Sequence, residues 1–187
     1  MAFGFDLAVT LVGLIVFGQH VWALRGHFAS ERMTTGARII SLGALAACFA
    51  LLLLLWSQAQ PLGAQIVGIA VMVASLALFW AAVRASREAK LRFAFDEALP
   101  RSLVTIGPYA QIRHPFYTSY LLFWIGWGIA VWSIWALIPI LVMAALYTVA
   151  ARYEENLLGD SDMATAYAEY RQRAGMFWPK LRNIPFQ

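Results

Sequence analysis

The chain has 187 residues, the length of one domain of ordinary size. Hydrophobic residues make up 61% of it and charged residues 13%, whereas soluble domains have roughly 45–50% and 25%. This composition excludes a disordered chain and argues against a water-soluble globular domain. The single cysteine, Cys48, excludes a small scaffold held by disulfides. The formal charge of +4 fits membrane topology better than nucleic-acid binding, because the arginines lie between long apolar runs.

Five apolar spans are predicted, which makes the chain an all-α, polytopic membrane protein. A helix that crosses a bilayer needs about 20 mostly apolar residues. Residues 5–24, 37–56 and 62–83 supply three such runs. Residues 116–150 carry no charge and are too long for one span, so we expect a helical hairpin with its turn near residues 131–135. The first run has no basic segment before it, which favours a permanent helix over a signal peptide.

The basic residues predict the orientation. All 14 lysines and arginines lie in the first connection, the third connection or the C-terminal tail. With five spans, these three segments share one side of the membrane. The positive-inside rule then places the N-terminus outside and the C-terminus in the cytoplasm. We expect a multi-pass protein of a bacterial inner membrane.

The chain is predicted to form a single integral membrane domain over residues 1–187. Its three N-terminal spans lie within residues 5–83, and its catalytic region covers residues 84–187, with the hairpin at 116–150 and a cytoplasmic tail at 151–187.

Two cytoplasmic helices are expected outside the spans. Residues 84–99 mix basic and apolar side chains, which predicts an interfacial helix that Pro100 ends. In the tail, helical spacing predicts a second helix that Asp160 or Asp162 caps. The residues with that spacing are Met163, Tyr167, Tyr170 and Ala174.

Two charged motifs flank the hairpin. Pro115 suits the first turn of a helix, so Arg113 and His114 lie just outside a helix start, where free N–H groups favour an anion. Glu154 and Glu155 are expected to lie just beyond the end of the fifth helix. Because the hairpin is antiparallel, we expect these four residues to be neighbours at the cytoplasmic mouth, where ionisable groups are candidate functional sites.

Simpler interpretations of each residue remain open at this point. Arg113 alone is typical of an interfacial anchor, and His114 alone of a structural hydrogen bond. The Glu154–Glu155 pair is compatible with a solvated helix end. His20 and His27 lack metal-ligand spacing with any cysteine or acidic cluster, so we expect no metal site. The sequence has no glycine-rich dinucleotide motif and no P-loop.

The order of these motifs resembles a known family. Gly-Pro-Tyr at 107–109, Arg-His-Pro-Phe-Tyr at 113–117, an apolar hairpin and Glu-Glu-Asn-Leu-Leu at 154–158 follow one another. This pattern resembles the isoprenylcysteine carboxyl methyltransferases and the related phospholipid methyltransferases, over about residues 100–180. The first three spans match them only in hydropathy.

The resemblance implies a membrane methyltransferase that uses S-adenosylmethionine and releases S-adenosylhomocysteine. It implies carboxyl-O-methyl transfer, with Arg113 and Glu155 as catalytic residues, to a lipid-like or prenylated acceptor that arrives from the bilayer. A methionine-derived cofactor carries a carboxylate, an ammonium and a sulfonium group. Arg113 suits a carboxylate, either the cofactor's or the acceptor's, and one of the two glutamates suits the ammonium. The rings of Tyr109, Tyr117 or Tyr120 suit the sulfonium. The expected cofactor-binding residues are Gly107, Pro108, Tyr109, Arg113, His114, Pro115, Tyr117, Glu154 and Glu155.

Other functions stay open from the sequence. Within methyl transfer, the acceptor is a phospholipid amine or a small thiol in the alternative interpretations. In other classes, the chain is an NADPH-dependent membrane reductase or a non-enzymatic membrane subunit. The sequence does not distinguish Glu154 from Glu155 as the ligand of the cofactor.

Overall fold

The computed structural model describes residues 2–26, 33–89, 91, 95–96 and 102–180, and over these residues it contains helices and no β-strand. An isolated bridge joins Ile112 to Gly175. The predicted all-α class is therefore confirmed. The helices in chain order are α1 (Ala2–Gly26), α2 (Thr35–Ser57), α3 (Leu62–Ser86), η1 (Arg87–Ala89), η2 (Gly107–Ala110), α4 (Pro115–Val131), η3 (Ile134–Ala136), α5 (Leu137–Gly159) and α6 (Ala164–Arg173).

Four of these segments are long and apolar enough to cross a membrane: Gly4–Trp22, Thr35–Ser57, Leu62–Ser86 and Ile134–Gly159. They make the chain an integral membrane protein. The predicted count of five spans depends on α4, which is shorter, with 17 residues. α4 lies inside the bundle, and its side chains Phe123, Trp124 and Trp127 are fully buried.

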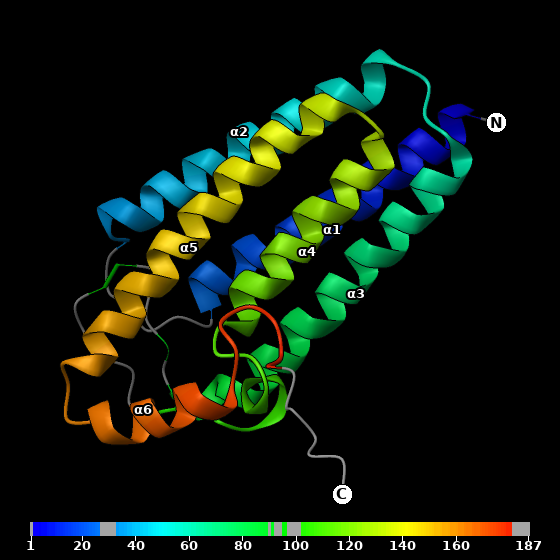
Figure 1. Cartoon of the computed structure of the whole chain (residues 1–187). Helices are drawn as coiled ribbons and strands as arrows, with labels where there is room; N and C mark the ends of the chain where they lie inside the picture. Colours follow the sequence, from blue (N-terminus) through cyan, green and yellow to red (C-terminus); the bar gives the residue numbers. More distant parts are fainter. Residues whose placement is uncertain (1, 27–32, 90, 92–94, 97–101, 181–187) are drawn as a thin grey trace, which may run out of the picture.

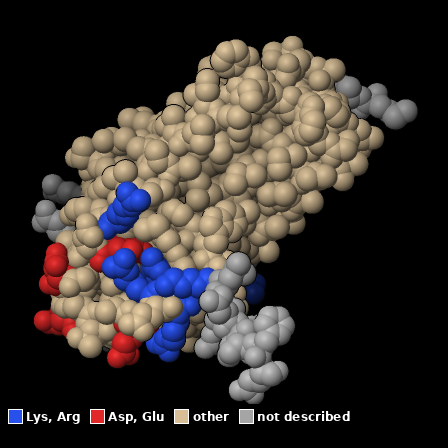
Figure 2. Space-filling model, viewed as in Figure 1, with Lys and Arg blue, Asp and Glu red and all other residues tan. Residues whose placement is uncertain are grey.

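The long helices run lengthwise as a bundle, with α4 beside α3 and α5 beside α2 (Figure 1). The charged side chains visible in Figure 2 gather at the end of the molecule that carries α6, and the other described residues on that face are uncharged. Large apolar side chains along α1, α2 and α5, such as Ile15, Leu42 and Leu141, are exposed. An apolar exterior with charges at one end is the surface that a bilayer requires.

Two glycines allow α3 and α4 to approach closely. A Cβ atom on Gly68 would lie 2.5 Å from the carbonyl oxygen of Gly126 and 2.7 Å from the backbone nitrogen of Ala130. A Cβ atom on Gly126 would lie 2.9 Å from the carbonyl oxygen of Gly68. Small residues at such crossings are the usual means of packing helices inside a membrane. This contact fixes α4, whose first turn borders the site described below.

The hairpin turn falls where the sequence predicts it. α4 ends at Val131, Trp132 adopts a left-handed conformation with φ of 49°, and η3 leads into α5. The prediction that Glu154 and Glu155 lie beyond the fifth helix is wrong, because α5 continues to Gly159. No proline or glycine interrupts the chain between Pro139 and Gly159, so the helix extends past the apolar run.

The two helices predicted outside the spans are confirmed in part. α3 continues to Ser86 and η1 follows it to Ala89, but Leu91, Phe95 and Asp96 of the predicted interfacial helix are not helical, and residues 90, 92–94 and 97–100 lie outside the described residues. The tail helix is confirmed as α6. Its predicted cap is wrong: Met163 is the N-cap residue, and the backbone N–H of Met163 donates to Oγ of Ser161 at 3.1 Å rather than to an aspartate.

Substitution of the two α3 glycines tests the α3–α4 contact. We expect Gly68→Ala to destabilise the protein by about 1–3 kcal/mol, because backbone atoms of α4 occupy the space of the new methyl group. Gly63→Ala in the same helix is the matched control, since no atom lies within 4 Å of its added Cβ. Thermal unfolding in detergent measures both. Equal melting temperatures for the two variants would contradict the close crossing.

Candidate functional site

A C-terminal strap, residues 174–177, holds the segment that precedes α4. The backbone N–H of Gly175 donates to the carbonyl of Gln111 at 2.9 Å, and that of Arg113 donates to the carbonyl of Gly175 at 2.8 Å. The N–H of His114 donates to the carbonyl of Met176 at 3.1 Å. These bonds place Arg113 and His114 between the start of α4 and the end of α5.

Arg113 forms a buried ion pair with Glu155. Its Nε donates to Oε1 of Glu155 at 2.8 Å, and the two side chains are only 8% and 6% exposed. One terminal nitrogen of the guanidinium donates to the carbonyl of Ala174 in the strap. Nη2 has no partner among the described residues. Arg113 thus joins α5 to the strap.

His114 connects both glutamates of α5. Its Nε2 lies 3.1 Å from Oε1 of Glu155, and its Nδ1 lies 3.6 Å from Oε2 of Glu154. Burial by itself lowers the pKa of His114, but the hydrogen bonds and charges of the two glutamates outweigh burial, so the pKa lies above its usual value. The imidazole is therefore stabilised in its charged form, in which both nitrogens donate.

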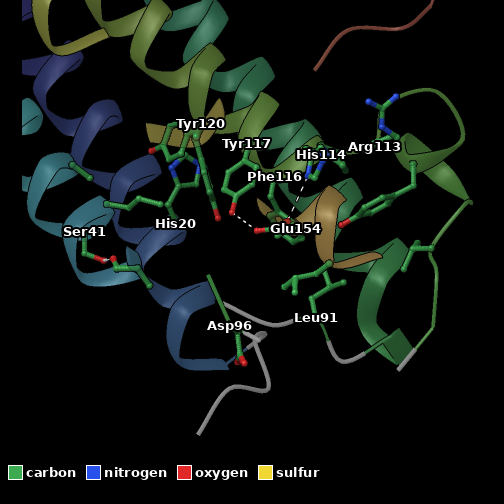
Figure 3. A pocket seen from close by; sticks show the side chains of 18 of the residues that line it. His20, Ser41, Leu91, Asp96, Arg113, His114, Phe116, Tyr117, Tyr120 and Glu154 are labelled. Carbon is green, nitrogen blue, oxygen red and sulfur yellow. Dashed lines mark hydrogen bonds and ion pairs between the residues drawn. The ribbon is translucent and has the colours of Figure 1, made fainter. Parts of the chain in front are cut away.

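Glu154 and Glu155 have different surroundings. Glu155 is held by Arg113 and His114, with the exposed Arg171 3.8 Å away. Glu154 is 32% exposed and accepts a hydrogen bond from the hydroxyl of Tyr117 at 2.5 Å (Figure 3). Neighbouring residues of an α-helix point about 100° apart. Glu154 consequently faces a cavity and Glu155 lies behind it.

The cavity has a volume of about 450 Å³ and is lined mainly by apolar and aromatic side chains. It runs from Glu154 and His114 to α1 and α2, where Phe17, Ile40 and Ala44 line it. Three neighbouring tyrosines line it: the ring of Tyr147 stacks on Tyr117 at 5.4 Å between centroids and lies 5.6 Å from Tyr120. A polar mouth and an apolar interior suit an amphipathic ligand.

The structure brings most of the predicted site residues together. Arg113, His114, Glu154 and Glu155 are neighbours, as the antiparallel hairpin predicts. Gly107 and Pro108 do not line the cavity; they form the turn of η2, where Gly107 has φ of 58°. The predicted residues that do line it are Tyr109, Arg113, His114, Pro115, Tyr117 and Glu154.

Sequence reasoning missed three residues of this region. Tyr170 of α6 donates to the carbonyl of Tyr109 at 2.6 Å and so fixes the turn before α4. Tyr147 completes the group of tyrosines from the middle of α5. His20 of α1 lines the cavity from the opposite side. The signal for His20 was present, since an ionisable residue inside an apolar span is unusual.

Comparison with known proteins identifies the family. Residues 63–161, more than half of the chain, match the phospholipid methyltransferase family. The chain therefore belongs to this family, which confirms the resemblance to the superfamily of membrane methyltransferases. The matched region contains α4, α5 and the Arg113–Glu155 pair.

One curated relative is the cobalt-zinc-cadmium resistance protein CzcN of Cupriavidus metallidurans. It is 35% identical over 82 residues, which cover 43% of this chain and 37% of that protein. Within the part of the chain that the structure describes, no group of three or more His, Cys, Asp or Glu residues is arranged to hold a metal ion.

The buried ion pair is expected to contribute to folding. Arg113→Met leaves Glu155 without its closest cation, and breaking a buried pair costs about 3–5 kcal/mol. Arg171→Met is the matched control, because Arg171 is exposed and an exposed pair contributes under about 1 kcal/mol. Chemical unfolding in detergent measures both, together with the double variant Arg113→Met/Glu155→Met. Equal losses of unfolding free energy in Arg113→Met and Arg171→Met would contradict a structural role for the Arg113–Glu155 pair.

The raised pKa of His114 predicts a dependence of stability on pH. The charged imidazole contributes stability fully below the pKa of an unfolded histidine, about 6.5, and this contribution disappears as pH rises through the higher folded value. We expect the melting temperature of the wild type to fall across this range relative to His114→Gln. Thermal unfolding at a series of pH values between about 6 and 9 measures the difference. Parallel curves for the two proteins would refute it.

Proposed function

We propose that the chain is an S-adenosylmethionine-dependent methyltransferase that acts on an amphipathic acceptor in the membrane. Membership of the phospholipid methyltransferase family supports the reaction class. The observation that carries the proposal is the position of Glu154, a carboxylate at the mouth of an aromatic cavity within a membrane protein. The same observation favours methyl transfer over a membrane reductase or a non-enzymatic subunit.

The residues present fit the charged groups of this cofactor. Glu154 suits the ammonium group, and Nη2 of Arg113 is available for the carboxylate. The rings of Tyr117, Tyr120 and Tyr147 suit a sulfonium, since aromatic faces attract cations. A volume of about 450 Å³ lies within the range of roughly 300–1,000 Å³ found for small-molecule sites.

Positioning is the main contribution that we propose for the protein. The bound cofactor supplies an electrophilic methyl group, and transfer requires the acceptor atom in line with the bond that breaks. Arg113 and Glu155 are predicted as catalytic from the resemblance. Because they pair with each other, they are proposed to hold Glu154, His114 and the strap in place around the cavity. Glu154 is the proposed contact with the ammonium group of the cofactor, and Nη2 of Arg113 the proposed contact with its carboxylate.

We further propose five spans, with α4 as the fourth, the N-terminus outside and the C-terminus cytoplasmic in a bacterial inner membrane. The distribution of the 14 basic residues supports this orientation. Under it, Glu154 and α6 lie at the cytoplasmic side, where the cofactor is available. The apolar part of the cavity, between α1 and α2, then lies within the bilayer.

The acceptor is proposed to be lipid-like and to reach the cavity from the bilayer. Apolar residues of α1 and α2 line the inner part and suit an alkyl or prenyl chain. The resemblance to isoprenylcysteine carboxyl methyltransferases predicts a carboxylate on a prenylated cysteine. Arg113 is the only lysine or arginine among the described lining residues, and its free nitrogen is already assigned to the carboxylate of the cofactor. The described lining offers no second cation, which favours an uncharged acceptor group over a carboxylate.

Calorimetry with S-adenosylhomocysteine tests the cofactor site. We expect micromolar binding to the purified wild-type protein in detergent and at least about tenfold weaker binding to Glu154→Gln, which loses one ionic contact worth about 1.5–3 kcal/mol. Glu169→Gln, an exposed glutamate of α6, is the matched control and is expected to bind like the wild type.

Two results would count against this site. Unchanged affinity in Glu154→Gln would remove Glu154 from the cofactor site, while leaving the reaction class in place. No binding to the folded wild-type protein would overturn the proposed methyltransferase function itself.

A further inference from the structure

His20 of α1 places a polar side chain among aromatic rings. Only 9% of the residue is exposed, and its Nε2 has no hydrogen-bond partner. The imidazole lies 4.6 Å from the ring of Tyr120, 5.0 Å from Phe79 and 5.3 Å from Phe123, measured between centroids. None of the ion pairs among the described residues involves His20. An uncharged imidazole is therefore the form that this burial favours.

A second polar group of the same cavity also lacks a partner in the protein. Tyr120 lines the cavity beside His20 (Figure 3), and its hydroxyl makes no hydrogen bond to the residues that the structure describes. The neighbouring hydroxyl of Tyr147 differs, because it accepts a hydrogen bond from Nε1 of Trp124 at 3.1 Å. Tyr120 and His20 thus form an uncharged polar pair in the aromatic part of the cavity.

Two adjacent polar groups without partners favour a bound ligand. Contacts with aromatic rings replace a hydrogen bond only weakly, and ionisable residues inside membrane helices are usually functional. A tyrosine hydroxyl donates one hydrogen bond, and a neutral imidazole nitrogen donates or accepts according to its tautomer. An oxygen of a bound molecule can therefore satisfy both groups at once.

The pair lies beyond Tyr117 as seen from the mouth of the cavity. The hydroxyl of Tyr117 donates to Glu154, and the ring of Tyr117 lies 6.3 Å from that of Tyr120, which contacts His20. The charged side chains that line the cavity are Arg113, Glu154 and Asp96. The pair itself carries no charge, so it suits an uncharged part of a ligand whichever charged group the ligand also has.

We propose that Tyr120 and His20 bind an uncharged oxygen, a carbonyl or a hydroxyl, of the lipid-like acceptor. This inference rests on the proposed function, because it concerns the acceptor in the same cavity. The bound oxygen anchors the acceptor with its alkyl chain toward α1 and α2. The pair contributes binding and specificity, and it does not determine which atom of the acceptor is methylated.

Two tyrosine variants test whether the hydroxyl of Tyr120 is unpaired in the ligand-free protein. Tyr147→Phe leaves Nε1 of Trp124 without its acceptor, and we expect it to lower the melting temperature by about 2–4 °C. Tyr120→Phe gives up no hydrogen bond to the protein, so its melting temperature should equal or exceed that of the wild type. A loss in Tyr120→Phe as large as that in Tyr147→Phe would overturn the proposal, because the hydroxyl would then have a structural partner.

Three ten-carbon probes test the class of ligand. In detergent with S-adenosylhomocysteine, the melting temperature of the purified protein is titrated with 1-decanol, methyl nonanoate or decane, which gives apparent affinities. We expect the alcohol, the ester or both to bind about three to ten times more tightly than decane, the gain from one neutral hydrogen bond. Preference for the alcohol alone would identify a hydroxyl, and preference for the ester alone a carbonyl. Equal affinities for all three probes would overturn the proposal.

Tyr120→Phe and His20→Phe keep an aromatic ring and remove the polar atoms. We expect each variant to bind the preferred probe no more tightly than decane. Tyr153→Phe is the matched control, since Tyr153 lies on α5 and does not line the cavity, and it should keep the wild-type preference. Wild-type preference in both Tyr120→Phe and His20→Phe would overturn the assignment of this pair. Tyr120→Phe, which removes a single oxygen atom, carries the test if His20→Phe does not fold.

Binding of S-adenosylhomocysteine separates this inference from the proposed function. Tyr120→Phe and His20→Phe should both bind S-adenosylhomocysteine like the wild type. If Tyr120→Phe loses this binding, the hydroxyl belongs to the cofactor site and its assignment to the acceptor is wrong. If the wild type fails to bind S-adenosylhomocysteine, the proposed function fails and this inference fails with it.

Discussion

The buried ion pair between Arg113 and Glu155 is the interaction on which the site depends. It joins the segment before α4 to the last turns of α5, and through the carbonyl of Ala174 it includes the C-terminal strap. Two charges at 8% and 6% exposure are stable only because each has further partners. His114 supplies one of them by donating to Glu155. The end of the bundle that carries α6 is thereby closed around a cavity that the membrane helices alone would leave open.

Adjacent residues of one helix then take separate roles. The turn of α5 that directs Glu155 into the ion pair directs Glu154 toward the cavity and Tyr117. Farther along the helices, contacts become aromatic and then apolar, from Tyr117 and Tyr120 to the α1 and α2 side chains. The same molecule therefore offers charged groups at the level of water and apolar surface at the level of the bilayer. Such a gradient suits a polar donor and a lipid-like acceptor in one site.

The membrane helices and the meeting of Arg113 with the glutamates followed from the sequence. Long apolar runs and an uncharged hairpin leave few alternative folds, because a bilayer admits only helices or closed barrels. The different roles of Glu154 and Glu155 could not be predicted from the sequence. They depend on the continuation of α5 to Gly159 and on the rotation of this helix about its axis. The place of His20 in the cavity did not follow either. It depends on how α1 packs against α3 and α4, which no local pattern specifies.

The response of folding stability to two ligands distinguishes a methyltransferase site from a reductase site. Thermal unfolding of the purified wild-type protein is measured with increasing S-adenosylhomocysteine and, separately, with NADPH. A ligand at about 100 times its dissociation constant stabilises a protein by about 2.7 kcal/mol. We expect S-adenosylhomocysteine to raise the melting temperature in a saturable way and NADPH to leave it unchanged. A melting temperature that rises with NADPH alone, or that rises with neither of the two ligands, would contradict a methyltransferase site at Glu154.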